Sequence, residues 1–215
     1  MAQQKIIITI NRECGSGGGE IARLLAEKLG FKIYGRTMLE EVAKQFDMTI
    51  ENMDRIKAQK ANWWKDFCQF YQEYSTSFYT RSAQPEATPM NIYYAEEHLL
   101  RELAEQESCI VVGRAGFHIF RDYPNAVHLL IMADHDARVA RIAKKEHLSD
   151  EEAIKVVDRI DKERDTYVKN VSGTSRFDVH NYDFMINVTG MATESVADFL
   201  VDYVHRKFDD AVPSK

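Results

Sequence analysis

The sequence predicts a doubly wound α/β domain with a five-stranded parallel sheet. Five apolar runs of strand length recur along the 215 residues, segments with helical spacing of apolar residues separate them, and a glycine-rich turn follows the first run. Strands that alternate with helices are typical of a parallel sheet covered by helices on both faces. The length and the 45% hydrophobic content fit one domain, residues 1–215, with one substantial core.

Each predicted strand is a short apolar run that ends at polar or glycine residues, which is the pattern of a strand buried on both faces. The predicted strands are residues 6–10, 31–34, 109–112, 127–132 and 184–188. Apolar residues recur every three or four positions between and after these runs, which predicts helices. The clearest helical segments are residues 21–29, 38–46, 137–142 and 196–204.

Residues 49–104 interrupt this alternation, because they contain no convincing strand and are dense in aromatic residues. We interpret them as an inserted, mostly helical lobe, with a loop marked by Pro85 and Pro89. The aromatic residues between positions 63 and 78 have helical spacing. That spacing favours a face packed in a core, or in a homodimer interface, over a surface on which bases stack.

Composition excludes several classes of protein. The formal charge of -6 gives no basic surface for nucleic acid. Cys14, Cys68 and Cys109 have the spacing of neither a disulfide framework nor a zinc site. The apolar run near the N-terminus is too short for a signal sequence or a membrane span. We therefore expect a soluble cytoplasmic protein without a membrane or nucleic-acid partner.

The glycine-rich turn after the first strand predicts a phosphate site. Glycines let backbone N–H groups approach a phosphate closely, and the N-terminus of the following helix adds a favourable field. A merely flexible turn is the alternative, but ordering so many glycines costs much conformational entropy. The predicted phosphate-binding residues of this turn are Gly15, Ser16, Gly17, Gly18, Gly19 and Glu20.

Alignment of the turn with the P-loop pattern GxxxxGK[ST] shows which groups are missing. Arg12 stands at the position of the first glycine of the pattern and Gly17 at that of the second. Gly18 stands where the pattern has its lysine, and Gly19 where it has the hydroxyl residue that binds the metal. A fold of the P-loop NTPase type then has to take its positive charge from elsewhere. The dinucleotide pattern GxGxxG fits less well, because its third glycine is Glu20 and no acidic residue ends the second predicted strand.

The chain resembles the cytidylate kinase-like family, a branch of the P-loop nucleoside monophosphate kinases. The start "TINRECGSGGGEIARLLAEKLG" is similar to the family's strand, glycine loop and helix. Further similar patches are "FKIYGRTMLEEVA", "CIVVGRAGFHIF", "HLLIMADHDARVARIAKKE", "VVDRIDKERDTYVKNVSG" and "NYDFMINVTGMATESVADFL". The likeness covers nearly the whole chain except the aromatic segment. Gly18 departs from the bona fide cytidylate kinases, which keep the loop lysine, and Gly35 stands where an aspartate is common.

This resemblance implies an ATP-dependent transfer of phosphate to a nucleoside monophosphate, CMP or dCMP, with Mg²⁺ carried by the nucleotide. It implies that residues 49–104 form the acceptor side, that Arg36 binds the acceptor, and that residues 138–172 form a lid over ATP. Within that lid, Arg159, Lys162 and Arg164 would approach the ATP phosphates.

Arginines are the predicted source of the missing charge, because phosphoryl transfer depends mostly on positioning and charge compensation. Arg12, Arg36 and Arg114 each follow a predicted strand, and ligands of open α/β sheets bind at the carboxyl ends of the strands. Arg138 and Arg141 share a helix face and are predicted to bind the nucleotide. Solvated ion pairs on charge-laced helices are the alternative for the lid residues.

Three functions remain open at this level. The first is a nucleoside monophosphate kinase with Arg12, Arg114, Arg159 and Arg164 as catalytic residues. The second is a nucleotide-binding regulatory protein without turnover, which the absent lysine favours, and the third is a kinase for another small acceptor, which the aromatic segment favours. We predict no dedicated metal site on the protein, although Ser16 and Glu20 lie nearest to the expected metal.

Overall fold

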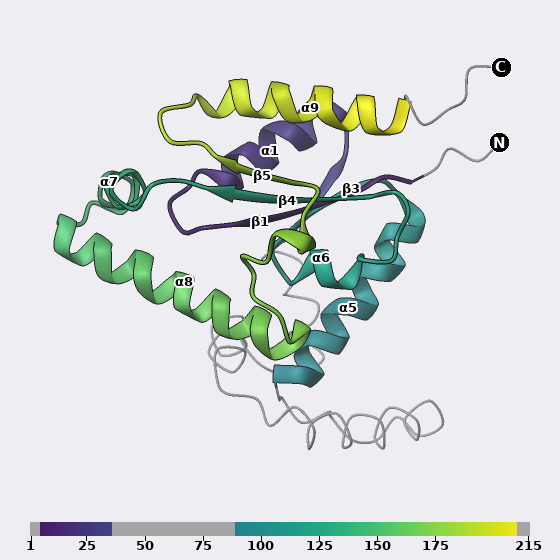
Figure 1. The fold of residues 1–215 in the computed structure, drawn as a ribbon, viewed down its shortest axis with the longest axis horizontal. Helices are drawn as coiled ribbons and strands as arrows, with labels where there is room; N and C mark the ends of the chain where they lie inside the picture. The colour runs from purple at the N-terminus through teal and green to yellow at the C-terminus, as the bar shows by residue number, and fades with distance from the viewer. Residues whose placement is uncertain (1–4, 36–88, 210–215) are drawn as a thin grey trace.

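The computed structural model describes residues 5–35 and 89–209 of the chain. Five parallel strands form one sheet in the order β2-β3-β1-β4-β5 (Figure 1). Their bounds are β1 Ile7–Arg12, β2 Lys32–Tyr34, β3 Cys109–Val112, β4 Ala126–Met132 and β5 Phe184–Asn187. All five predicted strands and the doubly wound α/β fold are thereby confirmed.

Helices cover both faces of the sheet (Figure 1). Helices α1 and α9 lie on one face, α5, α6 and α8 lie on the other, and α7 lies beyond the ends of the strands. The helices are α1 Gly18–Leu29, α5 Pro89–Gln106, α6 Gly116–Ile119, α7 His135–Glu146, α8 Asp150–Ser172 and α9 Thr193–Asp209, and Val179–Asn181 form a single 3₁₀ turn.

Alternation along the strands builds two cores, because successive side chains of a strand point to opposite faces. Ile7 of β1 packs on the face that carries α5, α6 and α8. Ile8 and Ile10 pack on the face that carries α1 and α9. Burial of both faces explains why the strands read as continuous apolar runs.

Helix α5 belongs to the main core. Its residues Met90, Tyr93 and Leu100 are buried and pack with Cys109 and Val111 of β3. Residues 89–104 of the predicted insertion therefore contribute to the helical layer on the sheet. The rest of that segment, with most of its aromatic residues, lies outside the described residues, as does Arg36. The inserted lobe, the homodimer and the role of Arg36 therefore stay predictions.

Helices α7 and α8 form a pair that extends past the carboxyl ends of the strands. Val139 and Ile142 of α7 pack against Ala153 and Val157 of α8 in a small core of their own that also includes Cys14. Ser149 caps α8 through a capping box with Glu152, which fixes the turn between the two helices. The site faces this helix pair.

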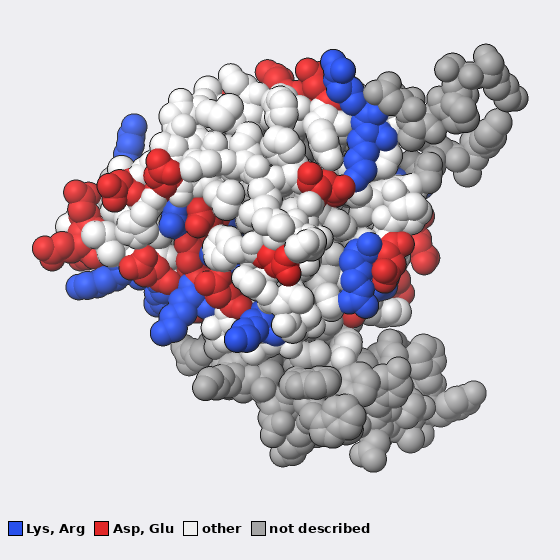
Figure 2. Space-filling model, in the orientation of Figure 1, with Lys and Arg blue, Asp and Glu red and all other residues white. Residues whose placement is uncertain are grey.

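The surface over α7 and α8 carries interleaved positive and negative residues (Figure 2). Such a face gives no single-sign field, in line with the net charge of -6. In the described residues, no helix is both long and apolar enough to cross a membrane.

Candidate functional site

The glycine loop connects β1 to α1 in a conformation that requires glycine at two positions. Gly15 has φ +78° and Gly17 has φ +85°, the left-handed region that other residues rarely adopt. At Gly15 a side chain would also meet backbone, because its Cβ would lie 2.6 Å from the carbonyl oxygen of Arg138. The turn thus brings the loop close to α7 and leads directly into the N-terminus of α1.

Buried Ser16 braces the loop from inside. Its Oγ donates to the carbonyl of Glu13 at 2.9 Å and accepts from the N–H of Gly18 at 3.3 Å. The amides of Gly15, Gly17 and Gly19, in contrast, find no acceptor within the described part of the chain. Free amides at a helix N-terminus form a site for an anion.

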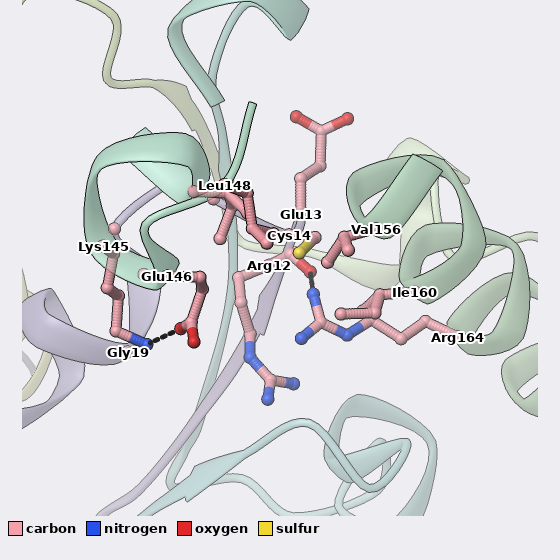
Figure 3. Close-up of a pocket in the computed structure, with 14 residues that line it drawn as sticks. Arg12, Glu13, Cys14, Gly19, Lys145, Glu146, Leu148, Val156, Ile160 and Arg164 are labelled. Atoms are coloured by element: carbon pink, nitrogen blue, oxygen red, sulfur yellow. Dashed lines mark hydrogen bonds and ion pairs between the residues drawn. The ribbon is translucent and has the colours of Figure 1, made fainter. Parts of the chain in front are cut away.

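These amides border a cavity of about 650 Å³ between the glycine loop and the α7–α8 pair (Figure 3). Its volume is within the usual range of small-molecule sites. Arg12 and Arg164 are cationic residues of its lining, and Ile142, Leu148 and Ile160 are apolar ones. Lys145 also lines it, but its Nζ is paired with Glu146 at 2.8 Å. Such a cavity suits a ligand with an anionic part and an apolar part.

Arg12 ends β1 and brings the least compensated charge to this site. Its guanidinium has no hydrogen-bond or ion-pair partner among the described residues, and Figure 3 shows it pointing away from Glu13 and Leu148. Burial, followed by the charges of Arg164, Arg114 and Arg176, lowers the pKa of Arg12 to about 9. An unpaired guanidinium in such surroundings is stabilised by a bound anion.

Arg114 follows β3 at the same edge of the sheet, as predicted. Its Nη1 lies 3.3 Å from Oε1 of Glu96, a fully buried carboxylate of α5. The hydroxyl of Tyr167 in α8 donates to the other oxygen of Glu96 at 2.9 Å. Glu96 thereby fixes Arg114 between two helices, with its position set by buried partners.

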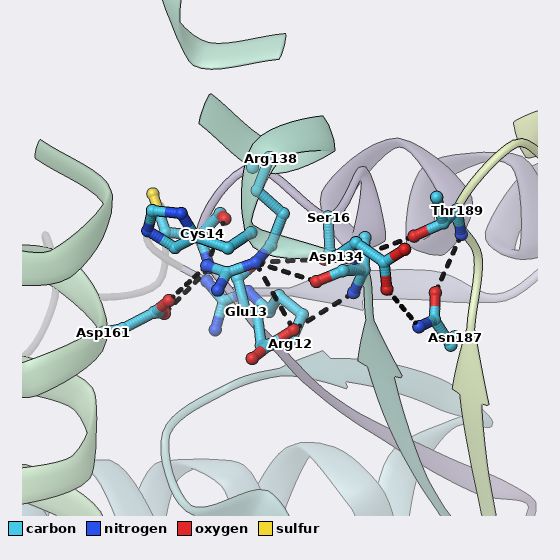
Figure 4. Close-up of polar contacts among 12 residues, drawn as sticks. Arg12, Glu13, Cys14, Ser16, Asp134, Arg138, Asp161, Asn187 and Thr189 are labelled. Atoms are coloured by element: carbon cyan, nitrogen blue, oxygen red, sulfur yellow. Dashed lines mark hydrogen bonds and ion pairs between the residues drawn. The ribbon is translucent and has the colours of Figure 1, made fainter. Parts of the chain in front are cut away.

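Asp161 of α8 holds the loop against the helix pair (Figure 4). Its carboxylate accepts from the N–H of Cys14 at 2.8 Å and from Nη1 of Arg138 at 2.6 Å. Arg138 is itself buried and donates to the carbonyls of Ala133 and Cys14 at 2.9 and 3.2 Å. These bonds engage Arg138 with the protein, so that it braces the loop from behind.

Arg164 and Arg176 both donate to the carbonyl of Arg12, each from Nη1 at 3.1 Å. Arg176 is buried and also pairs with Asp161 and Asp165. No sequence pattern predicts a role for Arg176, because it follows α8 in a loop without periodicity. Together the two arginines hold the end of β1 from which Arg12 projects.

Arg141 lies over the front of the loop. Its Nη1 donates to the carbonyl of Gly15 at 3.0 Å, and the same nitrogen would lie 2.5 Å from a Cβ on Gly17. The guanidinium therefore remains next to the free amides, consistent with its predicted contact with phosphate.

The remaining predicted residues lie on open surface. Arg159 is 61% exposed and pairs with Glu163 of its own helix at 2.9 Å. Lys162 and Glu20 are exposed, and none of the three lines the cavity. The i,i+3 pattern placed Arg159 and Lys162 on one helix face but could not show that this face points to solvent.

A comparison of two arginines on α8 tests this geometry. We expect Arg164→Ala to lower the rate of ATP-dependent phosphorylation at least tenfold, because Arg164 lines the cavity and supports Arg12. We expect Arg159→Ala to change the rate less than about threefold, because exposed ion pairs contribute little. Steady-state ADP production by the two variants would measure both effects, and equal losses would show that α8 turns its exposed face toward ATP.

Acid–base and metal chemistry have few candidates here. Burial raises the pKa of Cys14, so the thiol in the loop stays protonated at neutral pH. In residues 5–35 and 89–209 no three His, Cys, Asp or Glu side chains cluster as metal ligands would.

The parallel sheet, the glycine loop at the start of α1 and the arginines at the carboxyl ends of β1 and β3 define a protein of the P-loop kinase class. The model of the cytidylate kinase-like family matches residues 7–190, and the chain belongs to that family. It is thus a phosphotransferase of the nucleoside monophosphate kinase-like type.

Two curated relatives are similar over nearly their whole lengths. The cytidylate kinase of Thermoplasma acidophilum is 24% identical over 205 residues, which cover 93% of this chain and 94% of the relative. The cytidylate kinase of Sulfolobus acidocaldarius is 22% identical over 202 residues, with the same two coverages.

Solved structures show the same fold. An uncharacterized protein from Eubacterium ventriosum matches with a TM-score of 0.69 and 24% identity, over 93% of this chain and 98% of that protein. Shikimate kinase from Acinetobacter baumannii, in complex with shikimate, matches with a TM-score of 0.51 and 13% identity, over 95% of each chain.

Proposed function

We propose that the protein transfers the γ-phosphoryl group of ATP to a nucleoside monophosphate, with CMP and dCMP as the preferred acceptors. One observation carries the proposal most strongly: Gly15, Gly17 and Gly19, whose amides are free, line the same cavity as Arg12, whose guanidinium has no partner among the described residues. The relatives named cytidylate kinase support the choice of acceptor.

In this proposal the chain acts by positioning and by charge compensation. The loop amides hold the β- and γ-phosphates, and Arg12 neutralises the charge that develops on the transferred group. Arg164 approaches from the lid side and Arg114 from the end of β3, where the acceptor phosphate would lie between them. Mg²⁺ bound with ATP would add to the charge compensation that the loop amides and the arginines supply.

The transfer needs no nucleophile from the protein, because the acceptor itself attacks the γ-phosphorus. An oxygen of the acceptor phosphate forms the new P–O bond, the bond between the γ-phosphorus and the β,γ-bridging oxygen breaks, and ADP leaves with that electron pair. A phosphate oxygen is already ionised at neutral pH, so this step needs no general base.

A specific observation also favours a second function, nucleotide binding without turnover: the loop has no lysine at position 18. A kinase for a different small acceptor is the third. ADP production with ATP and Mg²⁺ should be measured over CMP, dCMP, UMP, AMP, GMP and a set of small hydroxylated acids. Turnover with CMP or dCMP at the highest kcat/KM is the expected result. ATP binding without turnover would support the regulatory function, and turnover of another acceptor would support the third.

A further inference from the structure

The space beside Gly18 is closed by Arg12. A Cβ on Gly18 would lie 2.7 Å from Cβ of Arg12, 3.2 Å from its Cγ and 3.3 Å from Cβ of Ile131. Carbon atoms in contact normally lie about 3.5–4.0 Å apart. The nearest of these atoms is fixed to the backbone of β1, so rotation of the Arg12 side chain cannot remove the clash.

The next residue along the loop has the opposite surroundings. A Cβ on Gly19 would have no heavy atom within 4 Å. A side chain is therefore sterically allowed at position 19 and excluded at position 18. The contrast shows that the glycine at position 18 is required by its neighbour and not by the loop conformation as a whole.

A second glycine, Gly113, leaves room for the guanidinium of Arg12. A Cβ on Gly113, which follows β3 with φ +78°, would collide with Nη1 of Arg12. Arg12 therefore runs between two glycines, with Gly18 beside the base of its side chain and Gly113 beside its guanidinium. The side chain of Arg12 therefore places its positive charge near the end of β3.

The other arginines around it are already engaged. Arg114 pairs with Glu96, Arg164 donates to the carbonyl of Arg12, and Arg176 pairs with Asp161 and Asp165. In the described part of the chain, Arg12 is the member of this cluster whose guanidinium has no partner. It is thus the group most available to an incoming anion.

We infer an exchange of the loop cation between two positions. Arg12, at the first position of the P-loop pattern, supplies the positive charge that the pattern's lysine would supply from position 18, and it excludes any side chain at position 18. This exchange rests on the proposed function and extends it, because it assigns the ATP phosphates as the partner of Arg12. Two consequences follow. A side chain at position 18 is incompatible with a Cβ at position 12, and a lysine at position 18 can restore the cation once position 12 is glycine.

The first consequence is tested by stability alone. Gly18→Ala should lower the Tm by at least about 5 °C, whereas Gly19→Ala, the matched steric control, should not lower it. The loss should persist with Arg12→Ala, which keeps Cβ, and disappear with Arg12→Gly, which removes Cβ. An equal Tm loss in all three backgrounds, or an R12G/G18A variant that does not fold, would overturn the steric exclusion.

The second consequence is tested by ATP affinity. Calorimetric titration with Mg²⁺ and ATP should show at least tenfold weaker binding for Arg12→Gly and for Gly18→Lys, and at least tenfold recovery for R12G/G18K relative to Arg12→Gly. No recovery in a folded R12G/G18K protein would overturn the exchange. Neither measurement requires turnover, so a wild-type protein that binds ATP but phosphorylates no acceptor would refute the proposed function and leave the exchange intact.

Discussion

Replacing Arg12 with methionine is expected to lower the rate of ATP-dependent phosphorylation about 100-fold, the cost of removing one preorganised donor to a developing negative charge. Methionine keeps much of the length of the side chain and removes only its charge and its hydrogen-bond donors. Steady-state ADP production at saturating acceptor would measure the loss. Both kcat and kcat/KM for ATP should fall, because Arg12 is expected to contact the transferred group.

The same substitution is expected to stabilise the protein without ligand. The pKa of Arg12 is lowered to about 9, first by burial and then by neighbouring arginines, so the fold disfavours its charged form. Below pH 9 the arginine is charged in both states, and its presence destabilises the folded state. Removal of that charge should raise the free energy of unfolding by roughly 1–3 kcal/mol, after allowance for solvent screening.

Arg23 offers the control on the exposed side of α1. It pairs with Glu27 at 2.6 Å, and both side chains are more than half exposed. Arg23→Met should leave the rate unchanged and alter the free energy of unfolding by less than about 1 kcal/mol. An Arg12→Met protein that is less stable than wild type, or that turns over ATP at the wild-type rate, would contradict our description of Arg12.

Asp161→Asn is expected to be the most destabilising charge substitution on α8. The carboxylate compensates Arg138 at 2.6 Å and Arg176 at 3.1 Å, and it accepts from the N–H of Cys14 at 2.8 Å. A neutral amide leaves two buried guanidinium groups without that charge. Removing one partner of such a network costs about 3 kcal/mol or more, which lowers the Tm by about 6–12 °C in a protein of this size. Urea unfolding and thermal melting would measure the change.

Asp158, one turn earlier on α8, provides the matched control. Its side chain is exposed and contacts Nε2 of His135 at 3.0 Å. Asp158→Asn should change the free energy of unfolding by less than about 1 kcal/mol, because exposed ion pairs contribute little. Similar effects of the two substitutions would show that Asp161 does not hold the loop.

The fold could be predicted well because a parallel sheet buried on both faces produces continuous apolar runs. All five runs are strands, and Arg12 at the end of β1 and Arg114 shortly after β3 lie at the same edge of the sheet. The loop was found from its glycines for a similar reason. Gly15 and Gly17 adopt backbone angles that other residues rarely adopt, so glycine at these positions indicates the conformation of the loop.

The partners of each arginine could not be predicted, because they come from distant parts of the chain. Arg138 was expected at the phosphates, yet its donors go to Ala133, Cys14 and Asp161. Arg176 and Glu96 gave no signal, since a buried charge in a loop or a helix looks like a surface charge when only the sequence is read. The glycine at position 18 indicates that the P-loop lysine is absent. The steric exclusion by Arg12 depends on the distance between positions 12 and 18 in the fold, which a sequence pattern does not contain.

The most direct test of the central claim is a structure of the protein with Mg²⁺ and a non-hydrolysable ATP analogue. We expect the β- and γ-phosphates to accept from the amides of Gly15, Gly17 and Gly19, with the guanidinium of Arg12 within about 3 Å of a phosphate oxygen. A polyphosphate bound away from this loop, or an Arg12 guanidinium that contacts no phosphate oxygen in the complex, would contradict it.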